Sequence, residues 1–361
     1  MGHEGQGQAQ GPAPAPFSRY WAQRTETRKH KDPQVQDQAS KERILHALLS
    51  DKEVSGQSLA DAAEISRTAV WKHISGLRDL GFRIQAGPGK GYRLLQTPDS
   101  LHPLVIRPGL KTQTLGQTME YREEVDSTQR VLRELARDGA AEGSVVLAER
   151  QMRGKGRRER GWDSLPGGVA MSVLFTPRLA PDRISQFLLL AGVAAAEAVN
   201  EQTEIRAGLK WPNDVLLQGK KIGGILAEMA SDAERIEHLI LGMGLNLNTA
   251  AEDIPPGIRD SATSVRAECG GPISRPRLVR DLLARLEHYY FRLLQSDFSP
   301  VRQEWLRHNV TLGRRVRADT DNAVLEGLAS DIDHTGALLL QDDTGTTHRL
   351  LAADISLRAK E

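Results

Sequence analysis

Residues 55–84, SGQSLADAAEISRTAVWKHISGLRDLGFRI, have the pattern of two short helices joined by a tight turn. Ser58 is the predicted N-cap of the first helix, because a serine oxygen can accept a hydrogen bond from a backbone N–H of the first turn. Ile65 and Ser66 form the predicted turn, and the second helix is predicted over residues 67–80. This arrangement predicts a helix-turn-helix.

The segments on both sides extend this unit. Residues 40–50, SKERILHALLS, carry four apolar side chains at helical spacing and predict an amphipathic helix. Residues 82–94, FRIQAGPGKGYRL, predict a β-hairpin with Gly-Pro-Gly at its tip. A helix-turn-helix followed by a hairpin is a winged helix, and we predict this domain over residues 39–97.

The charge of this domain favours DNA as its partner. Residues 66–95 hold six Lys or Arg against one acidic residue, Asp79, whereas the whole chain has a formal net charge of +1. Phosphate contacts supply affinity, and an outward-facing second helix can enter the major groove. The alternative is a protein-interaction module. The candidate DNA contacts are Arg67, Thr68, Trp71, Lys72, His73, Arg83 and Lys90.

Length and composition limit the remaining possibilities. A chain of 361 residues suggests two or three domains, and 26% charged with 39% hydrophobic residues is typical of a soluble globular protein. The single cysteine, Cys269, excludes an intramolecular disulfide and a CxxC redox pair, so we expect a cytoplasmic protein. The most apolar run, residues 187–196, is about half as long as a membrane span requires. Residues 1–38 predict a disordered tail.

Strand-like and helix-like segments alternate from residue 119 to residue 248. We predict strands over 119–125, 143–150, 169–177 and 238–248, a hairpin over 215–229 that turns at 218–220, and helices over 126–140 and 182–201. Mixed strands with helices between them predict an α+β domain with a sheet covered on one face.

A basic segment, ERQMRGKGRRERGW at residues 149–162, is predicted to be a loop of this domain. Gly154 and Gly156 allow the backbone to approach a ligand, and the side chains of Arg157, Arg158 and Arg160 can fork onto phosphate oxygens. The spacing matches neither GxxxxGK[ST] nor GxGxxG, so it is not a common nucleotide-binding loop. On its own, the segment is compatible with a solvated surface loop.

A second motif, KWPND at residues 210–214, supports a binding site. Pro212 favours an extended conformation for the residue before it, and the Asn-Asp pair suits a turn. Lys210 can neutralise charge that develops on a phosphate or a carboxylate, and Asp214 can reach a metal ion. The coexistence of the two motifs makes a site for an anionic ligand plausible.

The C-terminal part predicts a helix and a small β domain. Residues 274–294 carry an apolar stripe at helical spacing. Short alternating segments follow from residue 315 to residue 358, with turns at 334–336 and 343–345, and they predict a small SH3-like β-barrel.

Taken together, five motifs resemble the biotin–protein ligase family: DST at 126–128, ERQxxGKGRRxRxW at 149–162, KWPND at 210–214, GGILAE at 223–228 and GMGLNLN at 242–248. The winged helix and the final DISLR, 354–358, resemble the form of the family that also represses transcription. The resemblance covers about residues 40–361. It implies a ligase domain over residues 98–310 and an SH3-like domain over 311–361.

The resemblance also implies an activity. ATP, with Mg²⁺, and biotin as a substrate would form biotinoyl-5′-AMP, from which a lysine of a biotin carboxyl carrier domain would receive the biotinoyl group. The adenylate would also act as corepressor for a homodimer bound to operator DNA. No tightly bound prosthetic group and no membrane partner are expected.

Site residues follow from the resemblance, motif by motif. Lys210 and Arg157 are the expected catalytic residues, and Asp214 is the expected Mg²⁺ ligand. Biotin contacts are expected from Ser127, Thr128, Gln129, Gln151, Lys155, Gly156, Arg157, Lys210, Gly224 and Gly244. ATP contacts are expected from Arg157, Arg158, Arg160, Asn213, Asp214, Asn246 and Arg358.

The sequence departs from the family pattern at a few positions. The loop has Lys155 where an arginine is usual and Glu159 where a glycine is usual, and Ala170 stands where an aromatic residue is common. A lysine keeps the charge of an arginine but loses its planar fork. These departures leave open a ligand-sensing repressor with weak ligase activity. A lipoate–protein ligase, which shares the catalytic fold, is a further alternative, and the winged helix and KWPND argue against it.

Overall fold

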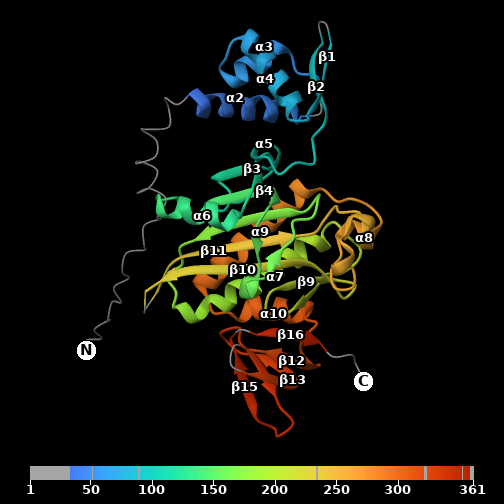
Figure 1. The fold of residues 1–361 in the computed structure, drawn as a ribbon. Helices are drawn as coiled ribbons and strands as arrows, with labels where there is room; N and C mark the ends of the chain where they lie inside the picture. The colour runs from blue at the N-terminus through green and yellow to red at the C-terminus, as the bar shows by residue number, and fades with distance from the viewer. Residues whose placement is uncertain are drawn as a thin grey trace, which may run out of the picture. The chain divides into compact units, whose positions relative to one another are not determined.

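The computed structural model describes residues 33–50, 52–87, 90–232, 235–320, 323–351 and 353–357. Contacts within the chain divide it into two compact units, Met1–Pro98 and Asp99–Glu361 (Figure 1). We predict the end of the DNA-binding domain one residue before this division. In the part of the chain that the structure describes, no helix is long and apolar enough to cross a membrane.

The first unit is a winged helix. It contains α2 (Pro33–Leu48), α3 (Gly56–Ala63), α4 (Arg67–Asp79) and a hairpin of β1 (Arg83–Gly87) and β2 (Gly91–Gln96). Its core consists of the apolar side chains that face one another between these elements: Ile44, Leu45, Leu48, Leu59, Val70, Ile74, Leu77, Phe82 and Ile84.

Two details of the first unit differ from the sequence prediction. The N-cap of α3 is Ser55 rather than Ser58, because the Ser55 Oγ accepts a hydrogen bond of 3.0 Å from the Ser58 backbone N–H. Helix α2 begins at Pro33, so residues 33–38 are helical although we predict them as part of the tail. The other residues of the predicted tail, 1–32, lie outside the described residues.

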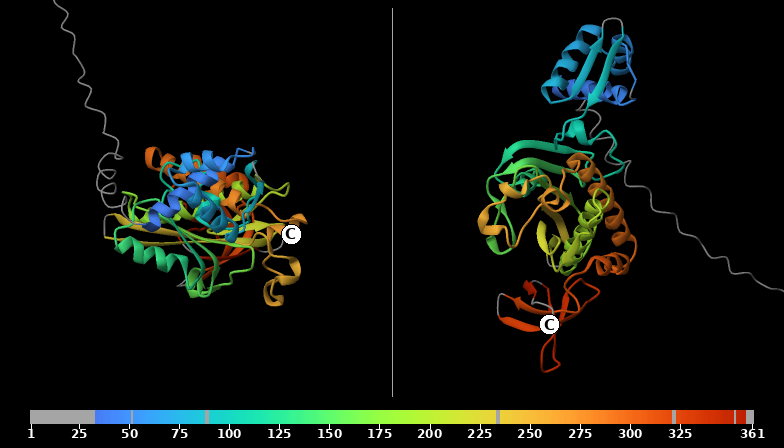
Figure 2. Two further views of the ribbon diagram at one scale, coloured as in Figure 1. Left: turned by 90° about the horizontal axis from the view of Figure 1, so that it is seen from above. Right: turned by 90° about the vertical axis from the view of Figure 1, so that its right-hand side faces the viewer.

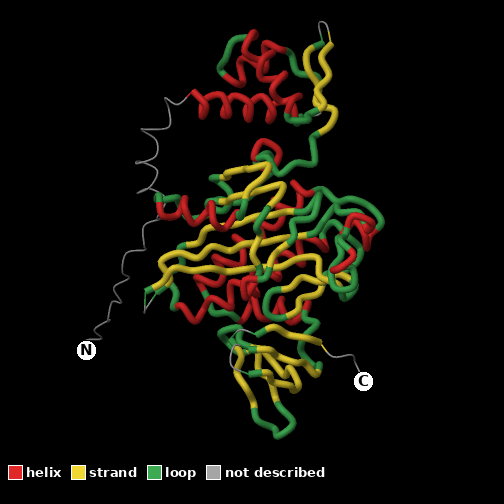
Figure 3. Tube along the Cα trace, viewed as in Figure 1, coloured by secondary structure: helices red, strands yellow, loops and turns green. Residues whose placement is uncertain are grey.

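A seven-stranded mixed sheet forms the centre of the second unit (Figures 1 and 3). Its strand order is β3-β4-β7-β11-β10-β9-β8, and only β3 and β4 pair in parallel. The strands are β3 (Met119–Val125), β4 (Val145–Gln151), β7 (Val169–Phe175), β8 (Gly208–Lys210), β9 (Asp214–Leu217), β10 (Lys220–Ser231) and β11 (Ile236–Leu245).

The two faces of this sheet are covered unequally. Helices α7 (Ile184–Asn200) and α9 (Arg275–Gln295) pack on one face and form the main core of the unit (Figure 2, right). Helix α6 (Thr128–Arg137) packs on the other face, over a small cluster that includes Val146, Leu174 and Ile240. The sequence predicts coverage of one face only, whereas α6 covers part of the second face and leaves the rest for a cavity.

The C-terminal β domain is a five-stranded antiparallel sheet of order β15-β14-β13-β12-β16. Its strands are β12 (Arg315–Asp319), β13 (Val324–Ile332), β14 (Leu338–Gln341), β15 (Thr347–Leu350) and β16 (Asp354–Leu357). It follows α10 (Ser299–His308). Together with the winged helix and the mixed sheet, this domain confirms the predicted α+β fold.

We expect a fragment of residues 99–361 to fold without the winged helix, because the contacts of the chain separate into two units at this point. Circular dichroism during heating should show one cooperative transition, within a few degrees of the main transition of the full chain. Aggregation of the fragment, or loss of the transition, would contradict the division.

Candidate functional site

A cavity of about 1110 Å³ opens on the sheet face that α6 leaves uncovered. Its walls come from the start of α6, the segment between β4 and β7, strands β8 to β11, and strands β12 and β16 of the C-terminal β domain. The cavity is at the upper end of the size range of small-molecule sites.

A row of residues with little or no side chain crosses the sheet beneath the cavity. Gly224 on β10 pairs with Gly244 on β11, Gly244 pairs with Ala170 on β7, and Ala170 pairs with Ala148 on β4. Directly paired residues of neighbouring strands point to the same face. Asp214 on β9 pairs with Gly224 and places a carboxylate at the end of the row.

The indole ring of Trp162 lies over this row. A Cβ atom added to Gly244 would lie 2.4 Å from the Trp162 Cε2 atom, and one added to Gly224 would lie 3.2 Å from its Cζ3 atom. Glycine at position 244 therefore allows the ring to approach the strand. Trp162 is itself held by a short hairpin, in which Gly154 pairs with it across two antiparallel strands.

Polar side chains occupy the wall nearest to α6. The Gln151 Oε1 atom accepts hydrogen bonds from the Thr128 backbone N–H at 2.8 Å and from the Thr128 hydroxyl at 3.0 Å. The Gln129 Nε2 atom donates to the Leu226 carbonyl at 3.2 Å, and its side chain packs over Gly242. The amide groups of both glutamines thus line the cavity with fixed orientations.

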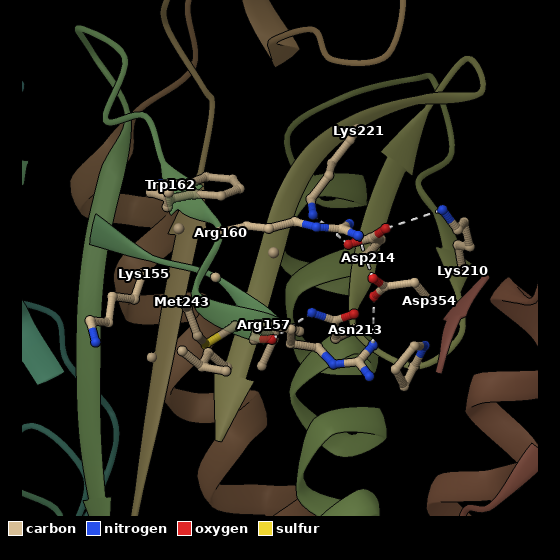
Figure 4. Close-up of a pocket in the computed structure, with 18 of the residues that line it drawn as sticks. Lys155, Arg157, Arg160, Trp162, Lys210, Asn213, Asp214, Lys221, Met243 and Asp354 are labelled. Atoms are coloured by element: carbon tan, nitrogen blue, oxygen red, sulfur yellow. Dashed lines mark hydrogen bonds and ion pairs between the residues drawn. The ribbon is translucent and has the colours of Figure 1, made fainter. Parts of the chain in front are cut away.

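Two lysines share one carboxylate at the opposite wall (Figure 4). The Lys221 Nζ atom lies 2.5 Å from Asp214 Oδ1, and the Lys210 Nζ atom lies 3.4 Å from Asp214 Oδ2. The Lys221 Nζ atom also lies 5.6 Å from the centroid of the Trp162 ring, which is within cation–π range. The ring and the cations therefore meet in the middle of the cavity.

The basic loop, residues 152–168, adds arginines that contact the C-terminal β domain. The Arg160 Nη2 atom lies 2.5 Å from Asp354 Oδ2, and the Arg157 Nη1 atom donates to the Ala353 carbonyl at 3.0 Å. Burial lowers the pKa of Arg157, and this effect is partly offset by the carboxylates of Asp354 and Asp214. An arginine stays cationic at neutral pH, so these groups remain available to an anion.

The sequence predicts an irregular loop here, and the structure shows more order. Strands β5 (Gly154–Lys155) and β6 (Gly161–Trp162) pair around a 3₁₀ turn, Arg157–Glu159. The Gly156 backbone N–H donates to the Arg160 carbonyl at 2.7 Å and closes the turn. This small hairpin directs Arg157, Arg160 and Trp162 to the cavity, while the Lys155 side chain points away from Asp214 (Figure 4).

The KWPND turn is fixed by its neighbours. The Trp211 side chain is buried, its backbone N–H donates to Thr311 Oγ1 at 2.9 Å, and its indole Nε1 donates to the Gly336 carbonyl at 3.0 Å. The Asn213 side chain donates to the Ile225 carbonyl at 2.8 Å. These three hydrogen bonds hold the backbone that carries Lys210.

The structure brings most of the predicted small-molecule contacts together in this cavity. Those that line it are Thr128, Gln129, Gln151, Lys155, Gly156, Arg157, Arg160, Lys210, Asn213, Asp214, Gly224 and Gly244.

Three predicted residues do not line the cavity, and a fourth is not described by the structure. Ser127 caps α6, where its side chain accepts from the Arg130 N–H. Arg158 lies behind the loop, 3.3 Å from Asp319 and 3.4 Å from Asp354. Asn246 is buried and donates to the Thr263 carbonyl at 3.2 Å. Arg358 lies outside the described residues.

Of the lining residues that were not among the predicted contacts, Trp162, Lys221 and Asp354 matter most for the arrangement of the site. Each of these residues lies inside or beside one of the family motifs, so its position in the sequence could have indicated a place in the site. Trp162 ends the basic segment, Lys221 comes two residues before GGILAE, and Asp354 begins DISLR. Their proximity depends on strand pairing and on the contact between two domains, which the motifs alone do not reveal.

The predicted Mg²⁺ ligand, Asp214, could supply one carboxylate oxygen to a metal ion in the cavity. Among the described residues, no group of three or more His, Cys, Asp or Glu side chains could hold a metal ion. Mg²⁺ commonly takes one or two carboxylates and completes its shell with water and substrate phosphates. Asp214 supplies one such carboxylate in the cavity, and therefore fits a metal that arrives with a nucleotide.

The candidate DNA-contacting surface is mostly exposed, with one correction. Arg67, Thr68, Lys72, Arg83 and Lys90 are exposed, and so is Trp71, at 64%. His73 is buried, at 6%, with its Nδ1 atom 3.6 Å from Asp37 Oδ1 of α2. His73 follows Val70 by three positions on the same helix and thus shares its buried stripe, so His73 is not available to DNA.

Comparison with known proteins agrees with the fold and the cavity. The biotin/lipoate A/B protein ligase family profile matches residues 121–246, a helix-turn-helix (HTH) domain profile matches 41–93, and the biotin protein ligase C-terminal domain profile matches 311–358. Along the chain the helix-turn-helix match comes first, the ligase match second and the C-terminal match last, and together they define a protein ligase of the biotin/lipoate class that carries a helix-turn-helix domain.

Whole-chain relatives define the family more closely. The bifunctional ligase/repressor BirA of Bacillus subtilis (strain 168) is 39% identical over 305 residues, which cover 84% of this chain and 94% of that protein. BirA of Escherichia coli (strain K12) is 31% identical over 324 residues, 88% of this chain and 97% of that protein. The chain therefore belongs to the bifunctional ligase/repressor family, as the sequence motifs predict.

A solved structure shares the fold of the second unit. The biotin protein ligase from Aquifex aeolicus, in complex with biotin and ATP, is 30% identical with a TM-score of 0.59. The match covers 68% of this chain and 100% of that chain.

We expect Gly244→Ala to displace the Trp162 ring, because the added methyl group would overlap the indole. In protein labelled with 5-fluorotryptophan, the ¹⁹F resonance of Trp162, assigned with Trp162→Phe, should shift. Gly271→Ala is the control, since a Cβ atom there meets nothing within 4 Å. An unchanged Trp162 resonance in Gly244→Ala would show that the ring does not lie on the row.

Proposed function

We propose that the protein activates biotin with ATP as biotinoyl-5′-AMP, transfers the biotinoyl group to a lysine of a biotin carboxyl carrier domain, and represses transcription when the adenylate is bound. One observation carries the ligase part. The cavity joins a flat strip of small residues covered by Trp162 to a cluster of Lys210, Lys221 and Arg157. The strip suits an uncharged ring system, and the cationic cluster suits a carboxylate that is attached to this ring system and a phosphate that reacts with it.

The first half-reaction needs positioning more than covalent chemistry. A carboxylate oxygen of biotin attacks the α-phosphorus of ATP, the bond to the β-phosphate bridge breaks, and pyrophosphate leaves. Lys210 and Lys221 lie where they can bring the two anions together and offset charge that accumulates on the phosphoryl oxygens. Mg²⁺ held by Asp214 and the phosphates would supply further charge neutralisation.

The second half-reaction releases AMP. The amine of the carrier lysine attacks the acyl carbon of the mixed anhydride, the bond between that carbon and the phosphate oxygen breaks, and the amine loses a proton. Until then the adenylate must be kept from water. Arg157 and Arg160 of the basic loop can exchange their contacts to the C-terminal β domain for the adenylate phosphate, and thereby cover it.

The winged helix supports the repressor part of the proposal. The exposed face of α4 carries Arg67 and Lys72, and the hairpin carries Arg83 and Lys90. The first turn of α4 contains no acidic residue, so this surface suits contacts to phosphates and bases. The proposal includes a homodimer in the adenylate-bound state, because an operator with two half-sites requires two winged helices.

We expect Lys210→Ala and Lys221→Ala each to lower the rate of biotin adenylation roughly 10²–10³-fold, since removal of one well-placed charge costs about this much. Pyrophosphate release with biotin and MgATP measures the rate. Lys220→Ala is the matched control: Lys220 is adjacent to Lys221, but its Nζ donates to the Arg259 carbonyl outside the cavity. Activity within fivefold of wild type in both cavity variants would exclude the assigned roles.

We expect Arg157→Gly to release the adenylate into solution roughly 10- to 100-fold faster, because a charge-assisted contact to its phosphate is lost. Mass spectrometry should detect free biotinoyl-5′-AMP and biotin on lysines of a bystander protein. Arg153→Gly is the control, as an exposed arginine of the same loop that does not line the cavity. Equal release from the two variants would argue against closure by Arg157.

A further inference from the structure

One buried arginine joins the start of α9 to three other segments of the second unit. The side chain of Arg275, at the start of α9, is 8% exposed and contacts two carboxylates. Its Nε atom donates to Asp99 Oδ2 at 2.9 Å, and its Nη1 atom donates to Glu149 Oε2 at 2.6 Å. The Arg275 guanidinium also donates to the backbone carbonyls of Asp99 and Gly168, at 2.5 Å and 3.0 Å.

Two of these contacts join the ends of the basic loop. Glu149 belongs to β4, two residues before Gln151 of the cavity, and Gly168 is the last residue of the loop before β7. One guanidinium thus bonds to strand β4 on one side of the loop and to the residue that precedes β7 on the other. A loop that closes on the adenylate moves relative to these two residues, and Arg275 contacts both of them.

A third contact reaches the point where the chain enters the second unit. Asp99 is the first residue of that unit, directly after the winged-helix unit. The Arg275 backbone N–H donates to Asp99 Oδ1 at 2.9 Å. The next residues are also attached to Glu149, whose Oε1 atom accepts from the Leu101 N–H at 3.0 Å and from the Ser100 hydroxyl at 3.4 Å.

Asn248 adds a fourth segment to the same group. Its Nδ2 atom donates to Asp99 Oδ2 at 3.1 Å, and its backbone N–H donates to the Gly167 carbonyl at 3.0 Å. Asn248 ends the GMGLNLN motif. The entry of the chain is therefore bonded directly to Glu149 and to Asn248, and it is linked to the end of the loop at Gly167 and Gly168 through Asn248 and Arg275.

We propose that Arg275 is a positioning residue that couples the basic loop to the chain segment that carries the DNA-binding unit. Loop closure on the adenylate shifts Glu149 and Gly168, and Arg275 transmits this shift to Asp99. This inference rests on the proposed function, because it assigns the physical link between the ligase site and repression. Coupling between two sites in proteins commonly amounts to roughly 5- to 150-fold in affinity.

Asp99→Ala tests the link without disturbing the site. It removes the carboxylate that holds Arg275 and Asn248, and leaves Arg275 bonded to Glu149, to Gly168 and to the backbone carbonyl of residue 99. The Asp99 side chain is 44% exposed. Asp331→Ala is the matched control: its side chain is 45% exposed and pairs with Arg302, an arginine on α10, away from the network. Asp99→Asn keeps an acceptor oxygen and should rescue part of the effect.

The experiment compares DNA affinity with and without biotinoyl-5′-AMP, in full-length protein, on a duplex enriched from a random pool by the wild type with adenylate. For the wild type we expect the adenylate to strengthen binding, and for Asp99→Ala we expect this strengthening to fall about tenfold. The adenylation rate and the DNA affinity without adenylate should stay within about twofold of the Asp331→Ala control. The temperature of thermal unfolding should match that of the same control.

Three outcomes would overturn the inference in distinguishable ways. Full strengthening in Asp99→Ala would show that Asp99 does not transmit the ligand state. A parallel loss of adenylation or of heat stability would show a purely structural role. No strengthening in the wild type, or no enriched duplex, would contradict the proposed repressor function itself, and the coupling with it.

Discussion

Charge pairing inside the cavity is the constraint on which the arrangement of the site depends. Cationic side chains removed from water are costly unless carboxylates or hydrogen bonds compensate them. Asp214 holds Lys210 and Lys221, and Asp354 holds Arg160. Because these carboxylates come from the sheet and from the C-terminal β domain, the cations stay in place before any ligand arrives. A phosphate that enters competes with carboxylates already there, which favours ligands with more than one anionic group.

The unequal covering of the sheet decides where this cavity can exist. On the face of α7 and α9, the strands carry large apolar side chains and leave no space. On the other face, α6 packs over Val146, Leu174 and Ile240, and the same strands continue as Ala148, Ala170 and Gly244. The change from large to small side chains along each strand marks the boundary between core and binding site. A single sheet thereby serves both stability and binding.

Much of this organisation could be predicted from the sequence, and the reasons for the failures are physical. Helix α4 and strand β3 follow local periodicity, and their predicted bounds agree with the structure within one residue, whereas α2 begins seven residues before its predicted start. Ser55 and Ser58 are both hydroxyl residues near the start of α3, so local chemistry did not distinguish the cap. His73 was predicted as a DNA contact together with its basic neighbours on α4. Its position three residues after Val70 places its side chain on the buried face of the same helix.

The candidate site was predicted less completely, because it depends on long-range pairing. The small-residue row exists only through the register of four strands, and no single motif contains it. Lys221 is adjacent to Lys220, and only the pairing of β9 with β10 shows which of the two faces Asp214. The contact between Arg160 and Asp354 joins residues that are far apart in the chain. Motif similarity located the site, and the structure supplied its partners.

The attachment of Trp211 gives the C-terminal β domain a role beyond its own fold. The turn that presents Lys210 is hydrogen-bonded through Trp211 to Thr311 and to Gly336, which lies between two strands of that domain. The family profiles treat the ligase domain, residues 121–246, and the C-terminal domain, residues 311–358, as separate modules. The hydrogen bonds of Trp211 cross that division, and both modules lie within one compact unit. A recombination event that exchanged the C-terminal module alone would also exchange the support of the lysine at position 210.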